Sequence, residues 1–331
     1  MITRTIPSWH QELINAFREP DELAHYLQID PVVFHPEQAP DSDFSMLVPR
    51  GFAQRMEKQN PKDPLLLQII PRIEELHTAP EFCNDPVGDT AATMEPGLLH
   101  KYHGRTLLIT TGACSIHCRY CFRRHFPYSD SNTCGQNMRQ AIEYLKAHQE
   151  VDEVILSGGD PLMLSDSSLQ ELIRALEQIE HIQRLRIHSR MPVTLPERIT
   201  PALVKILTSN RLQTILVVHS NHANELAQSV LLAIHRLSQQ GITLLNQSVL
   251  LRDVNDSPES LYQLSTRLFS MGILPYYLHM LDRVQGAMHF EVSASEAASI
   301  HEKLQEMLPG YLVPRLVYEE TGAKSKLAVS L

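Results

Sequence analysis

The sequence contains no apolar segment long enough to cross a membrane and no concentration of positive charge. Its 331 residues carry a net charge of −9, with acidic and basic side chains interspersed, which disfavours a nucleic-acid or other polyanionic partner. No run reaches about 18 uncharged apolar residues, and the first residues lack the apolar centre of a signal peptide. We therefore expect a cytoplasmic protein without a membrane-bound part.

Cysteine is also scarce, with only five in the chain. In an unexported protein such cysteines are expected to be reduced thiols rather than disulfides. Three of them gather in the segment Cys114-Ser-Ile-His-Cys118-Arg-Tyr-Cys121, while Cys83 and Cys134 lie apart. The apolar residues 107–111 immediately before this segment predict a buried strand. The three thiols are therefore expected side by side, just beyond a strand end.

Three thiolates at C-x3-C-x2-C spacing suit a [4Fe–4S] cluster with one iron left for a small ligand. Two alternatives stay open at this point: a structural zinc site completed by His117 or His125, or three unrelated core cysteines. Zinc usually has four ligands in paired clusters, and the sequence has no second cluster. The pattern therefore favours the iron–sulfur site.

The chain pattern predicts an α/β fold, a partial (β/α)6 TIM-like barrel. Six apolar runs between about 105 and 279 alternate with helical periods between about 136 and 307, which is typical of a parallel sheet with right-handed crossovers. Residues 1–95, rich in Pro, Asp and Glu, are expected to form a mostly helical extension. We divide the chain into this extension, a core at 96–290 and a short C-terminal segment at 291–331.

Polar residues follow each of the six predicted strands, so they are expected on one rim of the barrel, where such folds carry their chemistry. The second strand ends in Ser157-Gly158-Gly159-Asp160. Two glycines let the backbone approach a ligand closely, and Asp160 adds an acceptor, so that this turn can hold an ammonium group.

These motifs resemble the lysine 2,3-aminomutase family of radical S-adenosylmethionine (SAM) enzymes. The resemblance rests on the three-cysteine loop followed by Ser157-Gly-Gly-Asp160, and on the segments at 122–128, 219–225, 246–256 and 275–282. Residues 55–58, 96–103, 122–128 and 276–279 are similar to the branch that serves elongation factor P. The resemblance implies a [4Fe–4S] cluster on Cys114, Cys118 and Cys121, with SAM on its open iron, and pyridoxal phosphate (PLP) as a further cofactor.

The resemblance also assigns roles to single residues. Lys326 is the implied PLP lysine, although the proline commonly found after that lysine is absent and Lys324 lies nearby. Arg123 would receive the substrate carboxylate, and Asp282 and Glu319 its distal ammonium group. The remaining cofactor-binding residues would be Ser157, Gly158, Gly159, Asp160 and His219 on the SAM side, and Lys101, Arg105 and Gln247 near PLP. His219 could instead have a purely structural role, because histidines that end strands are often packed and hydrogen-bonded within the fold.

The implied enzyme is an isomerase that converts L-lysine to (R)-β-lysine, which a separate ligase attaches to elongation factor P. A flavodoxin-like or ferredoxin-like protein would supply electrons. Two rivals remain: an aminomutase for another amino acid such as glutamate, and a non-enzymatic iron–sulfur or zinc protein. The acids Asp282 and Glu319 argue against the first rival, because glutamate would need a cation there.

Overall fold

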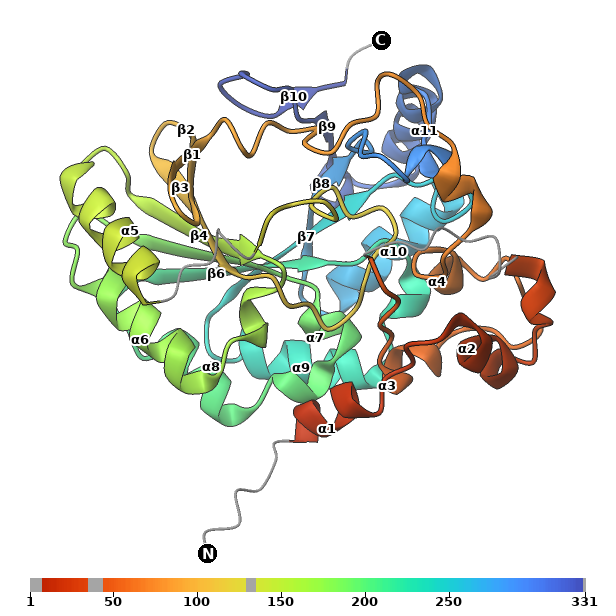
Figure 1. The fold of residues 1–331 in the computed structure, drawn as a ribbon, viewed down its shortest axis with the longest axis horizontal. Helices are drawn as coiled ribbons and strands as arrows, with labels where there is room; N and C mark the ends of the chain where they lie inside the picture. Colours follow the sequence, from red (N-terminus) through yellow and green to blue (C-terminus); the bar gives the residue numbers. More distant parts are fainter. Residues whose placement is uncertain (1–7, 35–43, 129–134, 330–331) are drawn as a thin grey trace, which may run out of the picture.

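A single curved sheet organises the chain in the computed structural model, which describes residues 8–34, 44–128 and 135–329 (Figure 1). Its strands pair in sequence order from β1 to β10, and the first does not pair with the last, so that the barrel stays open. The strands are β1 (Thr93–Glu95), β2 (Leu98–Tyr102), β3 (Arg105–Thr111), β4 (Glu153–Gly158), β5 (Arg184–Ser189), β6 (Gln213–His219), β7 (Thr243–Val249), β8 (Leu274–His279), β9 (Arg315–Tyr318) and β10 (Leu327–Ala328).

Strands β3 to β9 are parallel to one another, whereas β1 and β2 at one edge and β10 at the other pair antiparallel. The predicted α/β partial barrel is thus confirmed, with β9 as a seventh parallel strand. The sequence did not predict β1, β2, β9 or β10, which are two to five residues long. Strands this short and half-exposed have little hydrophobic pattern by which to be recognised.

Six longer helices cover the outside of the parallel strands (Figure 1). They are α5 (Gln136–Ala147), α6 (Asp166–Glu177), α8 (Pro201–Thr208), α9 (Gln228–Ser238), α10 (Pro258–Ser270) and α11 (Ala294–Met307). Hydroxyl caps start several of them: the Ser165, Thr200, Ser257 and Ser293 side chains accept backbone N–H bonds in the first turn. Helix α9 begins only at Gln228, because residues 223–225 form a separate 3-10 turn after β6.

The main core lies between these helices and the sheet, where Leu156, Ile187 and Leu216 of successive strands are fully buried. The N-terminal helices α1 (Ser8–Ile14), α2 (Pro20–Leu27), α3 (Arg50–Ala53) and α4 (Pro64–Leu67) precede the sheet. A second apolar cluster joins α2, α3 and α4 and includes Ile116 of the cysteine segment. The three-part division of the chain stays a prediction, but this cluster shows that the extension packs directly on the cysteine segment.

Segment 83–92 crosses the open side of the barrel, from the β1–β2 edge toward β9 (orange in Figure 1). At one end, Cys83 exchanges backbone hydrogen bonds of 3.0 Å with Arg283 and Gln285, beyond β8. Farther along, a Cβ atom at Gly88 would lie 2.7 Å from the Thr321 side chain. Both contacts lie on the β8–β10 side of the opening, so the segment is held there along its length.

Candidate active site

A cavity of about 310 Å³ opens at the C-terminal ends of the parallel strands, a size typical of small-ligand sites. Its wall includes every residue that the sequence predicted for the site: Lys101, Arg105, Cys114, Cys118, Cys121, Arg123, Ser157, Gly158, Gly159, Asp160, His219, Gln247, Asp282, Glu319 and Lys326. Residues from positions 101 to 326 therefore meet at one cavity. Their individual roles stay predictions.

The three cysteines of the loop after β3 are half-buried, whereas Cys83 is exposed and Cys134 lies outside the described residues. Burial, together with the neighbouring sulfurs, raises the pKa of Cys114 well above its usual range and that of Cys121 to about 11. Ionised thiolates are thus unfavourable here unless a cation compensates them, and a bound metal centre does so.

The N-terminal extension holds this loop through a buried ion triad. Glu75 accepts hydrogen bonds from Arg119 Nε at 2.7 Å and from Arg124 Nη2 at 2.7 Å. The Arg119 backbone N–H donates to the carbonyl of Gln68 at 2.9 Å. Because Arg119 and Glu75 are almost fully buried, removal of the Glu75 charge would leave Arg119 uncompensated, whereas Glu75 would keep Arg124 if Arg119 were removed. No local pattern in the sequence predicts this contact, since the partners are 44 positions apart.

The Ser157-Gly-Gly-Asp160 turn packs directly against the cysteine loop. Gly158 has a φ of +117°, and a Cβ atom at Gly159 would lie 2.4 Å from the Ala113 carbonyl oxygen, so that only glycine fits. The Asp160 carboxylate accepts hydrogen bonds from the Ser189 hydroxyl and from the backbone N–H groups of Leu162, Arg190 and Met191. Asp160 thus fixes the loop after β5, and the free ammonium acceptor that the sequence suggested is already engaged in the structure.

The donor set fits an iron–sulfur cluster better than a zinc ion. Within the described ranges no three His, Cys, Asp or Glu side chains are close enough together to hold one metal ion. His117 Nδ1 is 2.6 Å from the Ser45 carbonyl and His125 Nε2 is 3.3 Å from the Gln285 carbonyl. A cluster spreads its thiolates over several irons and does not need that proximity. Next to Cys118, the buried Arg190 Nε has no partner among the described residues, as expected beside a bound group.

Five charged side chains in contact with one another alternate in sign along the cavity wall. Asp89 contacts Arg123 Nε at 2.7 Å and Lys101 Nζ at 2.6 Å, and Glu319 contacts Lys101 Nζ at 3.1 Å and Lys326 Nζ at 2.8 Å. Burial acts to raise the pKa of Glu319, but the two lysines outweigh it and lower the pKa to about 2. Asp89, which sequence reasoning missed, comes from the segment that crosses the barrel opening.

Asp282 differs from Glu319, because its carboxylate forms no ion pair within the described part of the chain. Burial, followed by the negative charge of Glu319, raises the pKa of Asp282 to about 7. Lys326 and Lys101 act to lower this pKa but do not offset the two raising effects, so the carboxylate lacks a cation in direct contact. The position is therefore suited to receive one from a ligand.

Three histidines add neutral rings to the cavity wall. Burial lowers the pKa of His219 to about 3 and those of His188 and His279 well below their usual range. Each has a buried Nε2 atom with no hydrogen-bond partner among the described residues. An unsatisfied ring nitrogen facing a cavity is costly unless a ligand pairs with it, which favours the ligand-binding interpretation of His219 over the packing one.

Comparison with known proteins shows which family this cavity and its residues belong to. Residues 108–264 match the Radical SAM superfamily. The whole chain is 48% identical to the L-lysine 2,3-aminomutase of Escherichia coli (strain K12), 98% of which it covers. It is 46% identical to the enzyme of that name from Buchnera aphidicola subsp. Baizongia pistaciae, covering 95% of it, and 34% identical to that from Clostridium subterminale, covering 77%. In both cases the match takes in nearly all of this chain, 98% and 97%.

The chain belongs to the lysine 2,3-aminomutase family. The predicted resemblance is thereby confirmed, as is the enzyme class, an isomerase. Membership of the radical SAM superfamily implies a [4Fe–4S] cluster and SAM, which removes the zinc and non-enzymatic alternatives. No helix in the described ranges is long and apolar enough to span a membrane.

Proposed function

We propose that this lysine 2,3-aminomutase family member moves the α-amino group of L-lysine to the β-carbon and releases (R)-β-lysine. The observation that carries the proposal is the charge distribution of the cavity. Arg123 and the two acids Asp282 and Glu319 line the same cavity, and Asp89 and Lys101 lie between Arg123 and Glu319 in the series of ion pairs. Lysine has a carboxylate that matches the cation and a distal ammonium group that matches the acids. Glutamate would place its second carboxylate against the two acids.

Arg123 is held in an orientation that suits a carboxylate ligand. Its Nε donates to Asp89 and its Nη1 donates to the Ser157 hydroxyl at 3.1 Å, so that two sides of the guanidinium are fixed by buried partners. The side chain is almost completely buried yet reaches the cavity. A planar cation fixed in this way binds a carboxylate with little loss of side-chain entropy.

Lys326, Lys101, Arg105 and Gln247 suit a PLP molecule in the same cavity. Lys326 Nζ lies beside Glu319 and 5.9 Å from the centre of the Tyr277 ring. Lys101 and Arg105 supply positive charge for a phosphate, although Lys101 now contacts two carboxylates. When bound, the cluster and SAM supply a carbon radical, and PLP supplies a carbonyl carbon that can carry the migrating nitrogen. The protein binds lysine at both ends and limits the access of water.

The product is proposed to serve elongation factor P through a separate lysyl ligase. Support comes from the segments at 55–58, 96–103, 122–128 and 276–279, which are similar to the branch that serves this factor. Electrons would come from a flavodoxin-like or ferredoxin-like protein. This role places the enzyme in the cytoplasm.

The proposal is tested by incubating the reconstituted enzyme with L-lysine, SAM, PLP and a reductant under anaerobic conditions. We expect β-lysine, identified by chiral chromatography as the R enantiomer, and much less turnover of glutamate or of neutral amino acids of similar length. The protein should show both the broad absorption of an iron–sulfur cluster and a releasable PLP chromophore. Turnover of a neutral amino acid as fast as lysine would contradict the proposed substrate.

Reduction of the PLP-loaded protein with borohydride is expected to fix a pyridoxyl group on Lys326. This lysine faces the cavity, whereas Lys324 is exposed and does not line it. Peptide mass spectrometry after proteolysis identifies the labelled position, and Lys324→Ala is the matched control, which should label normally. A label on Lys324 would show that the assignment is wrong by two residues.

A further inference from the structure

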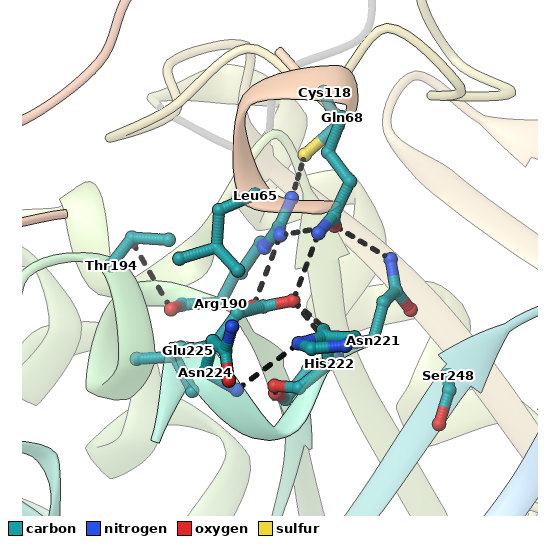
Figure 2. A network of polar contacts seen from close by, with 12 residues as sticks. Leu65, Gln68, Cys118, Arg190, Thr194, Asn221, His222, Asn224, Glu225 and Ser248 are labelled. Carbon is teal, nitrogen blue, oxygen red and sulfur yellow. Dashed lines mark hydrogen bonds and ion pairs between the residues drawn. The ribbon is translucent and has the colours of Figure 1, made fainter. Parts of the chain in front are cut away.

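Arg190, which follows β5, contacts one of the cluster cysteines directly. Its Nη1 donates a hydrogen bond to Cys118 Sγ at 2.7 Å (Figure 2). The arginine is only 6% exposed, so that water competes weakly for this bond. None of the site roles predicted from the sequence includes this residue.

Two fully buried side chains fix the guanidinium of Arg190. Its Nη2 donates to Gln68 Oε1 at 2.7 Å and to Glu225 Oε2 at 3.1 Å, and Figure 2 shows both partners on one side of the arginine. Gln68 is itself oriented, because its Nε2 donates to the Pro64 carbonyl at 2.9 Å and to Glu225 Oε1 at 3.2 Å. The donor to Cys118 is therefore preorganised by segments remote in the sequence.

Backbone N–H groups also hold the Glu225 carboxylate in place. Its Oε1 accepts the backbone N–H groups of Asn221 at 3.0 Å and His222 at 3.1 Å. Asn221 also donates its side-chain amide to Gln68 Oε1 and to the Tyr120 hydroxyl, within the cysteine loop. The network thus surrounds Cys118 with fixed dipoles and one cation, and the anion Glu225 lies behind that cation.

We propose that Arg190, oriented by Gln68 and Glu225, raises the reduction potential of the [4Fe–4S] cluster by donating a charged hydrogen bond to the Cys118 sulfur. One-electron reduction adds a negative charge to the cluster. Hydrogen bonds to the cysteine sulfurs and nearby positive charge stabilise that added charge, and both act strongly in a buried site. The inference goes beyond the proposed function, since it requires only the cluster implied by the radical SAM family.

The proposal predicts that the reduction potential shifts in opposite directions when the charge of Arg190 or that of Glu225 is removed. Removing the Arg190 charge should make the cluster harder to reduce. Removing the Glu225 charge leaves the arginine less compensated, so that the cluster should become easier to reduce. A network that only held the loop in place would not produce opposite shifts.

The test is a potentiometric titration of the reconstituted, full-length protein, followed by electron paramagnetic resonance with dithionite as reductant and without SAM. For Arg190→Gln we expect the equilibrium constant for reduction to fall at least tenfold, which is a 59 mV decrease for one electron. Glu225→Gln, which keeps an acceptor for the backbone N–H groups, should raise the potential. Arg190→Lys keeps the positive charge but loses the several N–H donors of the guanidinium group. Its reduction potential should lie between those of Arg190→Gln and the wild type.

Arg236→Gln is the matched control, because among the described residues the side chain of this exposed arginine on α9 donates only to the Ile199 carbonyl. The reduction potential of this variant should equal that of the wild type. Potentials of Arg190→Gln and Glu225→Gln that both equal the wild type would overturn the proposal, as would shifts of the same sign. If Arg190→Gln does not retain iron, Arg190→Lys and Glu225→Gln decide the question by the sign of their shifts. Omitting SAM and lysine keeps this outcome independent of substrate assignment.

Discussion

Replacing Cys114, Cys118 or Cys121 with alanine is expected to abolish binding of the [4Fe–4S] cluster. These three residues are the only cysteines of the described chain that line the cavity. A cluster with three protein thiolates already has one iron without a protein ligand, so the loss of another thiolate leaves it weakly held. Iron and sulfide analysis of the reconstituted variants, together with their visible absorption, measures the effect.

Cys83→Ala is the matched control and should retain a full cluster. Cys83 is exposed, and it contacts the segment beyond β8 through its backbone, which alanine preserves. Cys134→Ala, at a position outside the described residues, should also retain iron. Equal iron loss in all five single variants would contradict the assignment of the cluster to Cys114, Cys118 and Cys121.

The sequence predicted the cluster loop because its signal is local. Three cysteines within eight residues, directly after a buried strand, leave few alternatives. The same holds for the Ser157-Gly-Gly-Asp160 turn, where the glycines mark a close approach of two backbones that the structure places at Ala113. The parallel strands were equally predictable, since β4 is buried along its whole length and reads as one apolar run.

The supporting residues could not be predicted, because each acts through a partner far away in the sequence. Glu75 and Arg119 are 44 positions apart, Asp89 and Arg123 are 34 apart, and Gln68 and Arg190 are 122 apart. A single sequence contains no pattern for such pairs. Three of these residues, Gln68, Glu75 and Asp89, come from the N-terminal extension, so this segment completes the site rather than merely covering the barrel.

Asp282→Asn is expected to lower kcat/KM for lysine roughly 30- to 1000-fold. The substrate ammonium would lose a half-buried, charge-assisted partner, a loss on the order of 2–4 kcal/mol. Glu319 would compensate only in part, because its two oxygens also contact Lys101 and Lys326. Cluster content and PLP loading should be unchanged, which separates this effect from misfolding.

The raised pKa of Asp282, about 7, adds a signature in pH. The carboxylate must be ionised to bind an ammonium group, so kcat/KM for lysine should rise as pH increases through about 7, and Asp282→Asn should lose that rise.

The stability of the folded protein should instead fall as pH increases through the same range. A carboxyl group whose pKa is raised on folding contributes stability at low pH that is lost as pH rises toward 7. Without substrate, Asp282→Asn should therefore unfold at a higher temperature than the wild type at pH 8, where the wild type holds an unpaired, half-buried charge. Normal lysine turnover by Asp282→Asn, or a lower unfolding temperature at pH 8, would show that Asp282 is not the unpaired acid that receives the substrate ammonium.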